Sequence, residues 1–157
     1  MPDAVRTGLD VVRAAVPRWL RDARIGLVTS PAAIAPDFHH AVDILVEEIK
    51  LSIVALFGPE HGLRGTAQAG DHVGSTVDPR TGLPVYSLYG ATRTPSAAML
   101  EGIDILLVDL PDIPVRYATY ASTVFNLVEA AAEHGIALVL LDRPNALNGL
   151  VIQGNIL

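Results

Sequence analysis

Cysteine is missing from the sequence, and its absence excludes several kinds of site at once. Disulfide bonds, thiolate zinc sites and cysteine nucleophiles all need a sulfur atom that this chain does not have. The chain has 157 residues, of which 50% are hydrophobic, so it can bury a substantial core without covalent cross-links. The composition therefore indicates one ordinary globular domain and excludes global disorder.

Clusters of basic residues and long apolar runs are also missing. The formal net charge is -6, and no basic stretch is available to neutralise phosphates, so we expect no nucleic-acid partner. No apolar run approaches the roughly 18 to 20 residues that span a bilayer. Residues 1–26 hold arginines throughout and lack the apolar core of a signal peptide. We therefore expect a cytoplasmic protein with no membrane partner.

The sequence lacks the motifs of several familiar enzyme classes. No G-x-G-x-x-G follows the first apolar strand and no Walker A motif occurs, so a nucleotide cradle has no support. The nucleophile elbow G-x-S-x-G and the metalloprotease motif H-E-x-x-H are missing too. We accordingly expect no cofactor and no bound metal.

What the sequence does contain is a regular alternation of apolar and amphipathic segments. Apolar runs that suit buried strands occupy 24–30, 51–57, 103–110 and 136–142, and shorter strands are expected at 85–90 and 149–154. Helical spacing predicts helices at 8–21, 39–49, 94–102 and 117–135, the first of them ended or kinked at Pro17. Together these segments predict an α/β fold in a single domain over residues 1–157: a Rossmann-like, doubly wound, mostly parallel sheet with helices on both faces.

Polar residues gather in the segments that follow the four apolar strands. These segments are, in order, TSPAA, GPEHGLRG, DLPDIPVRY and DRPNALNG. In an open parallel sheet the carboxyl ends of the strands lie at one edge, and ligands bind there. We therefore expect the functional site at this edge, built from side chains of separate loops.

The segment GPEHGLRG, residues 58–65, carries the strongest candidates for chemistry. Glu60 lies between glycines that let a ligand approach the backbone, and a carboxyl group in a partly dry loop can act as a general acid. The alternative is that Glu60 caps a short helix or pairs with Arg64. His61 is a second proton carrier, a ligand contact or a metal ligand, or it simply hydrogen-bonds the loop backbone.

Arginines and aspartates in these segments have competing interpretations. Arg64 and Arg116 are suited to bind a substrate carboxylate through two parallel hydrogen bonds, and ion pairs with Asp71 or Asp112 are the alternative. Asp112 lies in a loop, where an exposed carboxylate is a functional hint. Asp109 continues its strand and is expected to bond neighbouring loop amides.

Three further residues at the same edge complete the candidate set. Tyr117 begins the long helix and is placed to stack against a sugar, with ordinary helix–sheet packing as the alternative. Arg143 and Asn145 lie in DRPNALNG, where an aspartate before RPN commonly organises a turn.

Several stretches, taken in order, resemble a known family. They are GLVTSPAAI, VALFGPEHGLRGTAQAG, DPRTGLPVYSLYG, MLEGIDILLVDLPD, RYATY and LDRPNALNG. The chain is similar over residues 8–155 to the amino-terminal half of the exo-β-N-acetylmuramidases, the NamZ or YbbC-like family. The resemblance implies a Rossmann-like domain followed by a smaller carboxy-terminal domain. It also implies release of N-acetylmuramic acid from the non-reducing ends of peptidoglycan fragments.

The resemblance further implies roles for individual residues. Glu60 would be the catalytic acid/base with His61 tuning it, and Arg64 and Gln68 would belong to the same substrate-facing loop. Asp112 is the candidate for the second carboxylate that glycoside hydrolysis normally needs. The lactyl group of muramic acid is an anion, which favours an arginine partner. The remaining residues that we expect to bind substrate are Arg116, Tyr117, Arg143 and Asn145.

Two features depart from the family. Pro111 and Pro114 stand in DLPDIPVR where the family has a glutamine and a glycine, and each proline removes an N–H donor. Proteins of the family are also much longer, so we expect the carboxy-terminal domain to be missing from this chain. The expected partners are a muropeptide or amino-sugar ligand, and a separately encoded second domain or another copy of the chain.

Three functional hypotheses follow from these residues. The first is a glycosidase domain of the exo-β-N-acetylmuramidase type. The second is a catalytically silent sugar-binding domain, or a subunit that requires a partner. The third is a metal-dependent hydrolase that uses Glu60, His61 and Asp112.

Overall fold

The fold is known from a computed structural model that describes residues 5–59, 63–64, 76–90, 92–115, 117–145, 147 and 150. Its helices are α1 Gly8–Ala14, α2 Arg18–Arg21, α3 Ala41–Asp43, the π-helical turn η1 Ile44–Glu48, α4 Ala97–Leu100 and α5 Tyr120–His134. Its strands are β1 Ile25–Thr29, β2 Ile53–Gly58, β3 Thr76–Val77, β4 Pro84–Ser87, β5 Ile105–Asp109 and β6 Ala137–Leu140. Four predicted site residues lie outside the described residues: Glu60, His61, Gln68 and Arg116. The predicted strand 149–154, apart from Leu150, lies outside them too.

The strands form one sheet in the order β3-β4-β2-β1-β5-β6. All neighbours are parallel except β3, which runs antiparallel to β4. From β1 the chain adds β2 and β4 on one side, and then returns to add β5 and β6 on the other. The predicted α/β fold with a mostly parallel, doubly wound sheet is confirmed. The order reverses between β1 and β5, which makes this boundary the topological switch point of the sheet.

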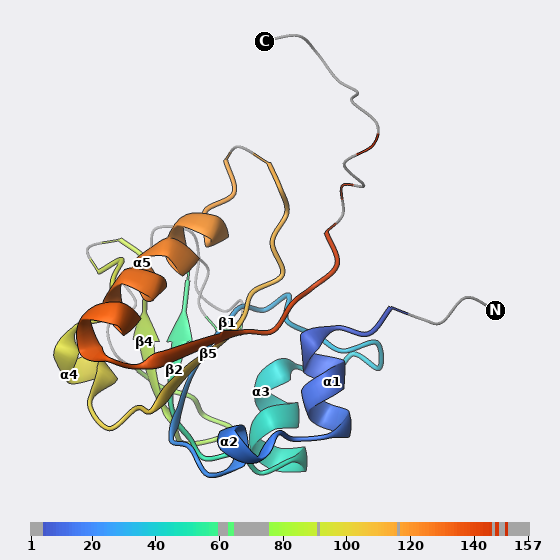
Figure 1. Ribbon diagram of the computed structural model, residues 1–157, viewed down its shortest axis with the longest axis horizontal. Coiled ribbons are helices and arrows are strands. Elements are labelled where there is room, and N and C mark those ends of the chain that lie inside the picture. Colours follow the sequence, from blue (N-terminus) through green and yellow to red (C-terminus); the bar gives the residue numbers. More distant parts are fainter. Residues whose placement is uncertain are drawn as a thin grey trace, which may run out of the picture.

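Helices cover both faces of the sheet, as Figure 1 shows, with α1, α2 and α3 on one side and α4 and α5 on the other. Neighbouring residues of a strand point to opposite faces. In β1, Leu27 therefore packs into the α1–α3 cluster, and Val28 packs into the α4–α5 cluster. The continuous apolar runs of the sequence reflect this two-sided burial. No helix among the described residues is long and apolar enough to cross a membrane.

Local sequence signals determine where the helices begin and end. Thr7 and Asp10 form a capping box at the start of α1, with their side chains bonded to each other's backbone N–H groups. Pro17 separates α1 from α2, which confirms the predicted break. Gly135 ends α5 in the left-handed conformation with φ at 66°, a geometry that glycine adopts without steric cost.

The strand β6 differs from its prediction. Its sequence suits a strand buried on both faces, yet β6 lies at the edge of the sheet among the described residues. Ala137 and Leu140 are exposed, and Leu140 keeps 53% of its surface accessible. The prediction of full burial is therefore wrong for the described structure, because apolar periodicity does not reveal whether a strand has one neighbour or two.

Gly8 brings the start of α1 against the backbone that follows β6. Its N–H donates to the carbonyl of Asp142 at 2.7 Å, and a Cβ at this position would lie 2.6 Å from the Cα of Leu141. We expect Gly8→Ala to destabilise the fold by roughly 1–3 kcal/mol, because overpacking against backbone forces a shift. Urea unfolding measures this change, with Ala14→Ser on the exposed side of α1 as a near-neutral control. An unchanged midpoint for Gly8→Ala would contradict the close packing of α1 on the end of β6.

Candidate functional site

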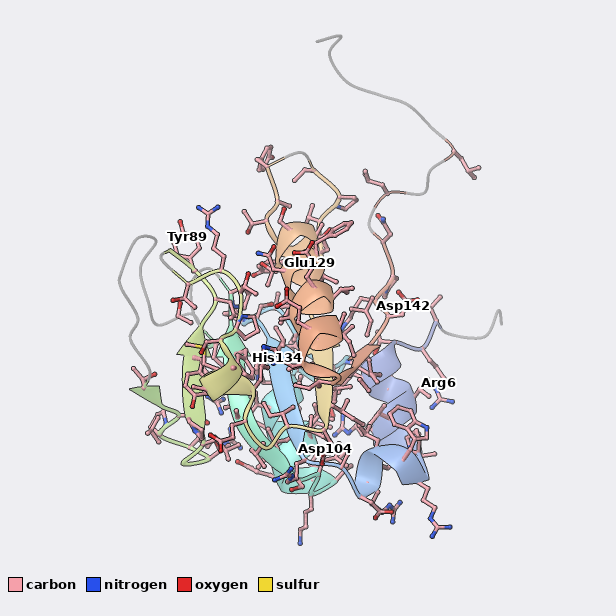
Figure 2. The ribbon with its side chains drawn as sticks, turned by 60° about the vertical axis from the view of Figure 1, so that its left-hand side comes forward. Arg6, Tyr89, Asp104, Glu129, His134 and Asp142 are labelled. Atoms are coloured by element: carbon pink, nitrogen blue, oxygen red, sulfur yellow. The ribbon has the colours of Figure 1, made fainter. Side chains whose placement is uncertain are left out.

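Parallel strands bring their carboxyl ends to one edge of the sheet. Thr29 of β1 pairs with Asp109 of β5, and Gly58 of β2 pairs with Ser87 of β4. Figure 2 shows Tyr89, just after β4, at the upper edge, and Asp104, just before β5, at the opposite edge. The segments that follow β1, β2, β4 and β5 therefore leave the sheet on the same side.

The GPEHGLRG segment begins at the buried end of β2. Gly58 and Pro59 are buried, and the carbonyl of Gly58 accepts a hydrogen bond from the N–H of Leu88 at 2.8 Å. Further along the segment, the side chain of Leu63 is buried in the α1–α3 cluster. Because Glu60 and His61 fall between these points, their roles stay predictions.

Arg64 is held by two carboxylates. Its Nε donates to Asp78 Oδ1 at 2.7 Å and its Nη2 to Asp78 Oδ2 at 3.0 Å, while Nη2 also reaches Asp43 Oδ1 at 3.1 Å. The Asp78 side chain is almost fully buried, with 1% of its surface exposed. Hydrogen bonds from Arg64 lower the pKa of Asp78 to about 2, and the same bonds raise the pKa of Arg64. The ion-pair alternative for Arg64 is thus present, with Asp78 and Asp43 as partners; of the two partners named from the sequence, Asp71 lies outside the described residues.

The same network continues onto the helix that follows β1. Asp43 also accepts from Arg80 Nη1 at 2.8 Å, and the Arg80 guanidinium bonds Glu47 in bidentate fashion at 2.8 and 2.9 Å. Asp78 in addition accepts from the N–H and hydroxyl of Thr81, which closes the turn before β4. The network, which we name the Arg64 clamp (Asp43, Glu47, Arg64, Asp78 and Arg80), ties the end of the GPEHGLRG segment to α3, η1 and the β3–β4 turn.

The Arg64 clamp predicts a specific dependence of stability on pH. The pKa of Asp78 falls from its ordinary 3.8 to about 2 on folding, so its contribution is full above pH 4 and disappears as the pH falls through 2. We expect Asp78→Asn to lower the free energy of unfolding by about 2 kcal/mol at pH 7. The difference between wild type and variant should shrink between pH 4 and pH 2.

Urea unfolding at a series of pH values measures this effect. Asp104→Asn is the matched control, because Asp104 pairs with Arg24 on an exposed surface and should contribute much less. A constant difference between wild type and Asp78→Asn from pH 7 to pH 2 would contradict the role of Asp78 ionisation.

Arg143 is engaged by the protein in a similar way. Its Nε and Nη2 donate to the two carboxylate oxygens of Asp109, each at 2.8 Å, and its Nη1 donates to the carbonyl of Ile34 at 2.7 Å. Asp109 is fully buried, and among the described residues its side-chain partner is this guanidinium, which the sequence did not predict. Arg143, in the segment after β6, thereby links the segment after β1 to the end of β5.

A hollow of about 380 Å³ opens beside the switch point of the sheet. Two predicted site residues border it: Asp112, which is exposed, and Tyr117, which exposes 86% of its surface. The rest of the lining is mainly apolar and consists of Ala32, Pro111, Ile113, Val115, Ala118, Thr119 and Tyr120. An apolar hollow with an aromatic ring and a carboxylate at its border suits a ligand that has both apolar and polar faces, as sugars do.

A second hollow of about 450 Å³ lies on the other side of Tyr117. It is more polar than the first, and its lining includes Arg93, Ser122 and Asn126. Among the described residues, the Arg93 guanidinium has no carboxylate partner, whereas Arg64 and Arg143 both have one. Arg93 was not among the site residues predicted from the sequence. It follows the short strand expected at 85–90, so the convergence of strand ends at one edge was a signal for it.

Two hydroxyl groups at the end of β1 are buried without a partner. Thr29 Oγ1 and Ser30 Oγ have no hydrogen bond within the part of the chain that the structure describes. Buried hydroxyls of this kind are uncommon, and water or a ligand often satisfies them. Their position at the switch point adds polar groups to the region where the sheet topology favours ligand binding.

Asn145 has a local role that is already visible. Its Oδ1 accepts a hydrogen bond from the N–H of Leu147 at 2.7 Å, a side-chain turn of the kind that asparagine commonly forms. Within the described residues, no group of three or more histidine, aspartate or glutamate side chains is arranged to hold a metal ion.

Comparison with known proteins identifies the family. The family model described as exo-β-N-acetylmuramidase NamZ, N-terminal, matches residues 25–157. The chain belongs to the NamZ family. It is 48% identical over 153 residues to the peptidoglycan β-N-acetylmuramidase NamZ of Bacillus subtilis strain 168, and this match covers 98% of the chain and 37% of that protein.

Two solved structures share the fold. One DUF1343 family protein from Bacteroides fragilis NCTC 9343 is 43% identical with a TM-score of 0.84, over 96% of this chain and 37% of that protein. A second DUF1343 family protein from the same organism is 34% identical with a TM-score of 0.74, over 91% of this chain and 36% of that protein. The chain therefore spans little more than a third of the length of these relatives.

Proposed function

We propose that the chain forms one wall of a glycosidase site that releases N-acetylmuramic acid from the non-reducing ends of peptidoglycan fragments. The observation that carries the proposal is the match to the NamZ family, which includes a peptidoglycan β-N-acetylmuramidase that is 48% identical to this chain. The hollow beside the switch point agrees with it, because Asp112 and Tyr117 border this hollow at the edge where the GPEHGLRG segment begins.

Within this proposal Glu60 protonates the glycosidic oxygen as the bond to the muramic acid C1 breaks. His61, next to it in sequence, tunes its proton affinity. Asp112 acts on the opposite side of the sugar, either as a nucleophile or as the base that activates water. Carboxyl groups about 5 Å apart would favour the covalent route, and a separation of roughly 6.5 to 9.5 Å would favour the inserted water. Tyr117 offers its exposed ring to a sugar face.

The lactyl carboxylate of muramic acid needs a cationic partner. Arg64 and Arg143 are each held by carboxylates of the protein, so we assign them to positioning of the surrounding loops. We propose Arg93, together with Arg116, as the contact for the lactyl group. Gln68 and Asn145 remain candidates for hydrogen bonds to the sugar.

We expect Arg93→Ala to raise the KM for a muramide substrate about tenfold or more, because loss of a charge-assisted hydrogen bond weakens binding by roughly 1.5–3 kcal/mol. The kcat should change little, and a glucosaminide without the lactyl group should show no such loss of affinity. Steady-state kinetics on both substrates measures the effect, with Arg18→Ala on α2 as the control. Equal weakening of binding to both sugars by Arg93→Ala would count against a lactyl contact.

A silent sugar-binding domain is the second candidate function, and Pro111 and Pro114 favour it, because each proline removes an N–H donor from the segment beside the hollow. Isothermal titration with N-acetylmuramic acid and an assay with a chromogenic muramide, both on the 157-residue chain, separate the two. Turnover by the chain alone supports the complete glycosidase. Binding without turnover supports the sugar-binding domain, and absence of both would remove the proposed sugar site from this chain.

A further inference from the structure

The β6 edge carries an apolar surface that edge strands normally avoid. Leu138 packs towards the α4–α5 cluster and Val139 towards the α1–α3 cluster, so β6 has the two-sided apolar pattern of an interior strand. Leu140 lies on the same face as Leu138 and is 53% exposed. Edge strands are usually protected by short length, charge or proline. The opposite edge follows that rule, because β3 has only two residues.

The helix α5 has a second apolar stripe next to this edge. Leu127, Ala130 and Ala131 face the sheet and are buried. A further set of apolar residues recurs at helical spacing and stays exposed: Ala121, Phe125, Val128 and Ala132. Phe125 exposes 74% of its surface and Val128 48%. One apolar face suffices for a helix that packs on a sheet, so the second face indicates a second packing partner.

The polar residues of α5 show on which side this stripe lies. Ser122, Asn126, Glu129 and Glu133 form the polar side of the helix. The side-chain amide of Asn126 donates to the carbonyl of Arg93, so the polar side is turned towards the segment after β4. The stripe with Phe125 and Val128 is consequently turned the other way, towards β6. In Figure 1, β6 crosses in front of the sheet with α5 above it.

The backbone of β6 leaves hydrogen-bonding groups open at the same edge. The N–H of Ala137 donates to Asp104 and the N–H of Leu141 donates to Val108, both towards β5. Successive N–H groups of a strand alternate between its two sides. The N–H groups of Leu138 and Leu140 therefore point away from β5, towards an edge that no described residue pairs with.

We propose that a strand and a helix from the C-terminal part of a NamZ family protein cover this surface, with the strand extending the sheet beyond β6. Crossovers between parallel strands are right-handed. A connection that continues from β6 in the same direction as β5–α5–β6 places its helix on the α5 face, against the Phe125 stripe. The strand would cover the exposed edge of β6, and the helix would cover the exposed apolar stripe of α5. The NamZ relatives contain a polypeptide that can form this strand and helix. The matched segment is their N-terminal part and covers only 37% of the B. subtilis protein.

Residue-resolved hydrogen exchange tests the proposal. The 157-residue chain is compared with a fusion in which the remainder of B. subtilis NamZ follows it. We expect the amides of Leu138 and Leu140 to exchange at least tenfold more slowly in the fusion. The amide of Val139, which bonds β5 in both proteins, should change little. Unchanged exchange at Leu138 and Leu140 would overturn the proposal.

Variants and light scattering distinguish the proposed strand and helix from a different docking surface and from a second copy of the chain. Phe125→Glu and Leu140→Lys should each reverse the added protection in the fusion, whereas Val77→Lys at the opposite edge should not. Equal effects of all three variants would overturn the assignment to β6 and α5. A dimer of the 157-residue chain in light scattering, with Leu138 and Leu140 already protected, would show that a second copy covers the edge and would also overturn it. None of these readouts depends on muramidase activity.

Discussion

Replacing Glu60 by glutamine is expected to lower the rate of muramic acid release by a hundredfold or more. Glutamine keeps the size of the side chain but cannot give a proton to the leaving oxygen, and general acid catalysis is worth roughly 10²–10⁴ in rate. The measurement is turnover of a chromogenic muramide by the fusion with the C-terminal part of B. subtilis NamZ. The KM should change much less than kcat, because the substituted amide still fills the same space.

Glu101→Gln is the matched control for this variant. Glu101 is an exposed carboxylate at the end of α4, away from the carboxyl edge of the sheet, and its substitution should leave kcat unchanged. Full turnover in Glu60→Gln would remove Glu60 from the mechanism. Loss of activity in both variants would indicate a general effect of charge and not a catalytic role.

The largest effect on stability is expected for Arg143→Met. The substitution leaves Asp109, which is fully buried, without its partner, and breaking a buried ion pair in this way costs about 3–5 kcal/mol. Chemical unfolding of the 157-residue chain measures the loss. Arg24→Met is the control, because its partner Asp104 is half exposed and can return to water. A much smaller change is expected there.

A double variant separates the two parts of this effect. Asp109→Leu combined with Arg143→Met removes both charges, and much of the lost stability should return because no charge stays buried. Normal stability of Arg143→Met together with a raised KM would instead assign Arg143 to the substrate and contradict its structural role.

Much of the fold follows from patterns within single segments. The apolar runs at 24–30, 51–57 and 103–110 became β1, β2 and β5, and the break at Pro17 and the end of α5 at Gly135 were predicted correctly. Such features depend on local chemistry, which the sequence displays directly. The convergence of strand ends at one edge follows from parallel pairing, and this placed Asp112 and Tyr117 beside a hollow.

The ion-pair partners could not be predicted in the same way. The ion-pair interpretation of Arg64 named Asp71 or Asp112, and the structure adds Asp78 and Asp43, which the sequence did not suggest. Asp43 comes from a helix that precedes β2, so only the folded arrangement brings it to Arg64. A local signal did exist for Asp78. In DPRTG an aspartate precedes proline, which is typical of a turn in which the aspartate side chain accepts hydrogen bonds from later turn residues.

The burial of β6 shows a different limit of sequence patterns. Hydrophobicity indicates that the strand suits burial on both faces, whereas among the described residues β6 pairs with β5 alone. The apolar sequence of 136–142 therefore suits an interior strand, whereas β6 lies at an exposed edge among the described residues. Covering β6, as proposed above, would reconcile them.

The hydrogen bond from Gly8 to Asp142 bears on the order in which the protein takes shape during synthesis. The ribosome releases α1 first, and the backbone on which α1 rests, at Leu141 and Asp142, follows more than 100 residues later. At a translation rate of about 5–20 residues per second, this first helix waits several seconds for its docking surface. A nascent chain stalled before β6 should accordingly leave the peptide bonds of α1 open to protease, and synthesis past Asp142 should protect them.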